Sequence, residues 1–114
     1  MQPALQAFFR PPFEMSAVAS PHRLRFGKLH GSADALALAR LAATSAPLVV
    51  VCGAALEAQR LREEIPWFAP NLRVSLLPDW ETLPYDTFSP HQDLVSERLE
   101  TLYRITSGDC DVAI

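Results

Sequence analysis

The chemistry to look for first lies in the turn around Gly31, which separates a short apolar segment from an alanine-rich helical pattern. A working phosphate loop has the spacing G-x-x-x-x-G-K-S/T, in which backbone N–H groups, a lysine and a hydroxyl hold the phosphates and magnesium. Aligned through Gly31, this chain has Lys28 at the first glycine (Gly27 is one residue too early), Ala33 at the second glycine, Asp34 at the lysine and Ala35 at the Ser/Thr. The turn lacks the groups that triphosphate binding requires.

Asp34 would also oppose phosphate directly. It places a negative charge at a helix N-terminus, which would otherwise favour anions, and the repulsion is about 1 kcal/mol at 4 Å in water. Lys28 lies on the wrong side of the turn to compensate. Three interpretations stay open: a turn that never bound phosphate and in which Asp34 satisfies the first helical turn, a relic phosphate loop, and a live site. Ser32 is the candidate N-cap of the helix that follows.

Other residues that could do chemistry gather between positions 79 and 98. The carboxylates of this segment belong to Asp79, Glu81, Asp86 and Asp93. No His or Cys lies near them at the spacing of metal ligands, so we expect them to cap turns and not to bind a metal. The aromatic residues Trp80, Tyr85 and Phe88 predict either a satellite core over the sheet edge or a platform for a base or a partner. We expect His91 to cap a helix or lie on the surface rather than act as a general base. Arg98 is expected to pair with a nearby carboxylate.

The elements that must position these residues follow from periodicity. We predict a strand near 23–29, a helix over 32–44, a strand over 47–52 covered on both faces, a helix over 54–65 that Pro66 ends, and a strand over 71–77. A further helix is predicted to begin at the capping-box pattern of Ser89, Pro90 and Gln92 and to stop at Gly108. Glu100 and Arg104 are expected to form an ion pair on it. Its apolar stripe is Leu94, Val95, Leu99, Leu102 and Ile105. A buried strand over 110–114 comes last. Such alternation predicts an α/β fold with a parallel sheet and helices on both faces.

Composition limits the function classes. The chain has 114 residues, 49% hydrophobic and 20% charged, with a net charge of −3, so we expect one globular domain and little nucleic-acid binding. Cys52 and Cys110 are expected to be reduced core thiols of a cytoplasmic protein, without a zinc site.

The sequence predicts no membrane segment. Residues 1–21 are expected to form a loose arm whose Phe8, Phe9 and Phe13 dock elsewhere, and the apolar strand at Ile114 suggests a fragment of a longer protein.

The segment "LLPDWETLPYDTFSPHQDLVSERLETLYRI", residues 76–105, resembles the N-terminal region of bacterial transcription-repair coupling factors. In that family a loop of this kind runs into an "HQD" helix, with Arg and Leu spaced as Arg98, Leu99 and Leu102 are here. The resemblance extends over about residues 22–114, because the turn near Gly31 and the segment "PLVVVCGAALEAQRLREEI" fall where the family has its degenerate loop, a strand and a helix.

This resemblance implies the first part of an excinuclease-B-like, RecA-like lobe that has lost ATP binding and serves as a scaffold without ATP turnover. The family protein is implied to be an ATP-dependent DNA translocase that displaces stalled RNA polymerase and recruits nucleotide-excision repair. It uses ATP and Mg in a distant motor, and its partners are RNA polymerase, the excinuclease A subunit, double-stranded DNA and its own further domains. For this chain we expect no cofactor and no catalytic residue. The alternatives are a nucleotide-binding domain of the phosphate-loop class and a DNA-binding helicase lobe.

Overall fold

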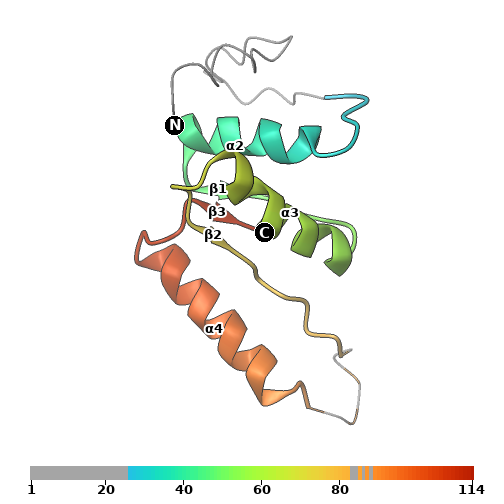
Figure 1. Ribbon diagram of the computed structural model, residues 1–114. Coiled ribbons are helices and arrows are strands. Elements are labelled where there is room, and N and C mark those ends of the chain that lie inside the picture. The colour runs from blue at the N-terminus through green and yellow to red at the C-terminus, as the bar shows by residue number, and fades with distance from the viewer. Residues whose placement is uncertain (1–25, 83–84, 86, 88) are drawn as a thin grey trace.

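The computed structural model describes residues 26–82, 85, 87 and 89–114, which form helices around a small sheet (Figure 1). In chain order the elements are α2 (Ala33–Ser45), β1 (Leu48–Val49), α3 (Ala55–Phe68), β2 (Val74–Ser75), α4 (Gln92–Thr106) and β3 (Val112–Ala113). The predicted α/β alternation is confirmed for these elements.

The sheet is parallel and has the strand order β1-β3-β2, so the last strand of the chain lies in the middle. Val112 is in register with Leu48 on one side and with Val74 on the other. Backbone bonds continue past the two-residue ladders, from the Val50 N–H to the Ala113 carbonyl at 2.8 Å and from the Ile114 N–H to the Ser75 carbonyl at 2.9 Å. The predicted burial of the segment 110–114 is confirmed, because Val112 is completely buried, although the strand itself covers only Val112–Ala113.

The core lies between one face of this sheet and two helices. α2 contributes three buried alanines at helical spacing, Ala35, Ala39 and Ala42, and their small side chains allow α3 to approach closely. From α3, Leu61 and Ile65 meet the β3 side chains in the same cluster. Leu48, Val50 and Cys52 of β1 and its exit pack against this cluster, as the period of two along a strand requires.

α4 lies on the other side of the sheet from α2 (Figure 1). Its buried Thr101 donates a 2.7 Å hydrogen bond to the carbonyl of Leu76, just beyond β2. The helix ends as predicted at Gly108, which has a φ of 76°. The Asp109 N–H bonds the Arg104 carbonyl at 2.8 Å and the Gly108 N–H bonds the Ile105 carbonyl at 3.3 Å, which is the Schellman arrangement that a left-handed glycine permits.

Two strand predictions are wrong in part. Of the strand expected over 23–29, residues 26–29 are described and are not in a strand; the φ of 59° at Lys28 breaks the extended conformation. The segment 47–52 was expected to be covered on both faces, yet Val49 and Val51 are 71% and 91% exposed. The helices α2 and α3 cover only the face that carries Leu48, Val50 and Cys52.

Two helix boundaries also differ from the prediction. α3 continues through Pro66 to Phe68, because a proline in the last turn removes a single backbone bond and Phe68 gains contact with the core. α4 begins at Gln92 with His91 as its N-cap, so Ser89 and Pro90 precede the helix. Within the stripe expected on α4, Leu99 and Leu102 are 62% and 45% exposed, and Thr101 takes the buried position instead.

Candidate functional site

The turn before α2 is built so that its first N–H groups are already bonded within the chain. Gly31 has a φ of 59°, and the Ala33 N–H donates to the His30 carbonyl at 3.2 Å. Ser32 occupies the N-cap position as predicted, but its hydroxyl makes no capping bond. The carboxylate of Asp34 instead accepts the Ala35 N–H at 2.7 Å, which is one of the groups that a phosphate would need.

Asp34 is also joined to the neighbouring helix. Arg60 of α3 donates from Nη2 to Oδ2 of Asp34 at 2.5 Å and from Nη1 to Oδ1 at 3.2 Å. The same Nη1 donates to Glu64 at 2.7 Å. The guanidinium nearest the turn is therefore shared between two carboxylates and ties α2 to α3.

The electrostatics of this pair hold Asp34 ionised. The hydrogen bond from Arg60 lowers the pKa of the Asp34 carboxyl below its ordinary 3.8, outweighing the opposite effect of partial burial. In return, Asp34 raises the pKa of the Arg60 guanidinium. At neutral pH the position of the phosphate-loop lysine thus carries a permanent negative charge, and the adjacent arginine is occupied by it.

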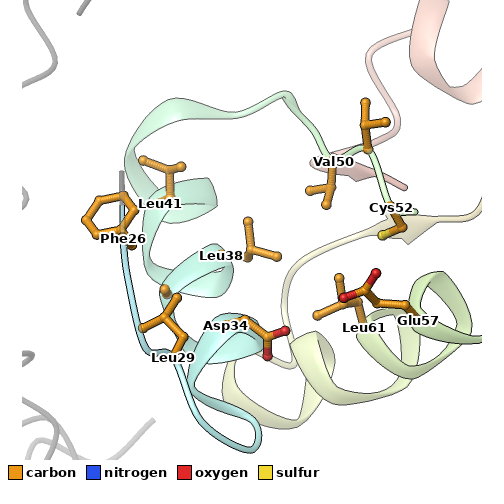
Figure 2. A pocket seen from close by; sticks show the side chains of 11 residues that line it. Phe26, Leu29, Asp34, Leu38, Leu41, Val50, Cys52, Glu57 and Leu61 are labelled. Carbon is orange, nitrogen blue, oxygen red and sulfur yellow. The ribbon is translucent and has the colours of Figure 1, made fainter. Parts of the chain in front are cut away.

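A mostly apolar cleft of about 270 Å³ opens beside Asp34. Figure 2 shows its walls, with Leu38 and Leu41 from α2, Val50 from the position just after β1, and Leu61 from α3. Cys52 lies beyond the end of β1, and burial raises the pKa of its thiol, with Glu57 adding to the rise. This cleft was not predicted from the sequence, because it arises where the alanine-rich α2 and the carboxyl end of β1 meet in space.

The predicted family-motif loop is anchored on α4 through Arg98. The guanidinium of Arg98 lies 4.3 Å from the ring centroid of Trp80 and donates from Nη1 to the carbonyl of Pro78. The expected carboxylate partner is not among these contacts. A cation over an aromatic face combined with a backbone hydrogen bond fixes the start of the loop; the Asp79 carboxylate accepts the Trp80 N–H at 2.8 Å, as in a capped turn.

Two aromatic residues of this loop that the structure describes are exposed. Tyr85 is 96% exposed and Trp80 is 41% exposed, so these two do not form the satellite core that was one of the predictions. Glu81 has a φ of 58°. His91 caps α4, accepting the Asp93 N–H at Nδ1 over 3.3 Å, which agrees with its expected role. Asp86 and Phe88 lie outside the described residues.

One charge cluster escaped the sequence analysis. Arg73, just before β2, donates to Asp111 at 3.0 and 2.8 Å and to Asp109 at 2.6 Å. Arg73 lowers the pKa of Asp111 to about 2. The signal that could have found this cluster is that neighbouring parallel strands begin at one edge of a sheet, which brings the charged residues just before β2 and β3 together.

The described residues contain no group of three or more His, Cys, Asp or Glu arranged to hold a metal ion. Within the same ranges, no helix has both the length and the apolar character needed to cross a bilayer. Cys52 and Cys110 are free thiols, half-buried and buried respectively.

No family model matches the chain, but individual proteins do. It is 44% identical over 103 residues to the transcription-repair-coupling factor of Escherichia coli, and 37% identical over 106 residues to that of Haemophilus influenzae. Each match covers 90% of this chain and 9% of the relative. The protein of the same name from Mycobacterium tuberculosis is 39% identical over 74 residues. The chain therefore belongs with the transcription-repair-coupling factors, as the counterpart of a segment that spans about 9% of their length.

Proposed function

We propose that this chain is the first part of a RecA-like, excinuclease-B-like lobe whose phosphate loop is degenerate, and that it serves as a scaffold without ATP turnover. The observation that carries the proposal is the Asp34–Arg60 ion pair at the N-terminus of α2. It supports a turn that does not bind ATP, because a carboxylate and its bound guanidinium occupy the region where a lysine would have to reach phosphate.

The wider role is proposed from the family resemblance. We propose that the whole protein is an ATP-dependent DNA translocase of the bacterial cytoplasm that displaces stalled RNA polymerase and recruits nucleotide-excision repair through the excinuclease A subunit. ATP, Mg and double-stranded DNA then belong to a motor elsewhere in the protein. This segment contributes a folded support for neighbouring domains and no catalytic residue.

Isothermal titration calorimetry of the 114-residue chain with Mg-ATP tests the proposal. We expect no saturable heat, because Asp34 repels the phosphates and Ala35 has no hydroxyl for magnesium. An intact phosphate-loop protein titrated in the same buffer provides the positive control. A dissociation constant in the micromolar range for this chain would overturn the proposal.

A second titration separates charge from architecture. The double variant Asp34→Lys with Ala35→Thr restores the two missing side chains but leaves Ala33 in place of the second glycine. We expect this variant to remain without saturable ATP binding, since the Ala33 N–H already bonds the His30 carbonyl. Nucleotide binding by the double variant, with none by the natural chain, would locate the loss in those two side chains alone.

A further inference from the structure

The cleft beside Asp34 has the properties of a binding site that the scaffold role does not use. It is an open hollow of about 270 Å³ between α2, the exit of β1 and α3 (Figure 2). Ligand pockets are concave, mainly apolar and carry a few polar groups. The volume is slightly below the range of about 300–1,000 Å³ found for drug-sized ligands, so the cleft suits one or two side chains rather than a nucleotide.

The polar groups of the cleft are all acidic. Among the described residues, its lining includes the carboxylates of Asp34 and Glu57 and no Lys, Arg or His. Figure 2 shows these two carboxylates around Leu61, below the apolar wall formed by Leu38 and Val50. Glu57 is exposed, and no ion pair involves it among the described residues. An occupant must therefore combine an apolar body with a positive charge at the rim.

The neighbouring charges strengthen this selection. Arg60 lies outside the lining of this cleft and is held by Asp34 and Glu64. Glu63 lines a second hollow along α3, which Glu57 and Arg60 also line. Together, Asp34, Glu57, Glu63 and Glu64 outnumber Arg60 and Arg62, the two arginines that lie between Glu57 and Glu64 on α3. Phosphates and other anions are repelled by such a field, whereas Lys and Arg are attracted.

We propose that the cleft docks a protein segment in which a large apolar side chain is flanked by lysine or arginine. The apolar side chain enters between Leu38, Val50 and Leu61, and the flanking cation lies against Glu57. This site does not depend on the proposed coupling role, because it rests on the shape and charge of the cleft alone.

Three synthetic peptides, titrated into the ¹⁵N-labelled 114-residue chain and followed by NMR, test the proposal. Their central sequences are Lys-Lys-Phe-Leu-Lys-Lys, Glu-Glu-Phe-Leu-Glu-Glu and Lys-Lys-Ser-Ser-Lys-Lys. We expect the first to shift the amides of Leu38, Cys52 and Leu61 saturably, the second to bind at least about fivefold more weakly because of its charge, and the third not to saturate. Equal affinity for the first two peptides would overturn the proposal. An absence of amide shifts at the cleft would also overturn it, because it would mean that the cleft does not accept the peptide, for example because another part of the chain fills it.

Matched variants locate the binding. Glu57→Gln should weaken the first peptide about two- to fivefold, the effect of one exposed charge. Glu63→Gln removes the same charge from the same helix outside the cleft and should leave the dissociation constant unchanged. Ala37→Phe should fill the cleft and abolish the amide shifts while the rest of the NMR spectrum shows a folded chain. If Glu63→Gln weakens binding as much as Glu57→Gln, the attraction is diffuse and the docking site is refuted.

Discussion

Asp34 is the residue on which the functional interpretation depends, because it converts a candidate phosphate site into a contact between helices. Its carboxylate bonds the Ala35 N–H and both terminal nitrogens of Arg60. The sequence alone predicted the loss of the lysine and hydroxyl. It did not predict the partner, since Arg60 is 26 residues away and its contact with Asp34 depends on how α2 packs on α3.

Replacing Asp34 with Ala should lower the free energy of unfolding by about 0.5–1 kcal/mol at neutral pH, because the pair is partly exposed and screened by solvent. The pKa of Asp34 is lower in the folded chain than its ordinary 3.8, so its contribution is present above that value. It is lost as the pH falls through the folded pKa. Urea titrations of both proteins, from neutral pH to about pH 2, should therefore converge on the acidic side.

Glu63→Gln is the control for that series, because Glu63 is exposed and lies on the same helix as Arg60. Its effect on stability should stay within about 0.5 kcal/mol. A difference between the natural chain and Asp34→Ala that persists at the acid end would show that Asp34 stabilises the turn by something other than its ionised pair.

At the scale of elements, the end of α4 is set by the conformation of Gly108, whose φ is 76°. A Cβ added there meets no atom within 4 Å, so any cost of Gly108→Ala comes from the backbone. We expect a loss of about 1 kcal/mol in the free energy of unfolding. Gly53 also has open space around it but is not at positive φ, so Gly53→Ala should be neutral or slightly stabilising. Equal effects in urea denaturation would contradict this account.

A second prediction at this scale concerns which face of α3 packs against the sheet. Ile65 is completely buried, whereas Leu56 on the same helix is 79% exposed. Ile65→Ala should cost about 2–5 kcal/mol through lost burial and the cavity left behind. Leu56→Ala should change stability by less than about 0.5 kcal/mol. Thermal or urea unfolding of the two variants checks the assignment of the helix face.

Element types were predictable from the sequence where side-chain periodicity is strong, and boundaries were not. The spacing of the alanines predicted the helix α2 correctly, and the apolar residues near the C-terminus predicted the strand β3 correctly. His91 displaced the expected cap because an imidazole nitrogen accepts the Asp93 N–H, an interaction outside the usual Ser/Thr pattern. Pro66 was tolerated because it lies in the last turn of α3. The cleft and the Arg73 cluster depend on tertiary contacts, so no local pattern could reveal them.

On the scale of the whole molecule, the sheet has one covered and one partly open face. Val50 packs on the core between α2 and α3, whereas its neighbours Val49 and Val51 are 71% and 91% exposed. Because successive side chains of a strand point to opposite faces, Val50 lies on the covered face, and Val49 and Val51 lie on the open face. On the open side, α4 bonds the chain just past β2 and leaves β1 uncovered among the described residues.

Substituting Thr for Val at positions 50 and 51 in turn distinguishes the two faces. Val50→Thr places a hydroxyl against the apolar core and should lower the free energy of unfolding by about 1–2 kcal/mol. Val51→Thr should change it by less than about 0.5 kcal/mol, while reducing the binding of the dye ANS to the exposed apolar face. Urea denaturation and ANS fluorescence measure the two effects. If Val51→Thr is as costly as Val50→Thr in the 114-residue chain, β1 is covered on both faces in solution, and the alternation seen at Val49 to Val51 does not describe the folded protein.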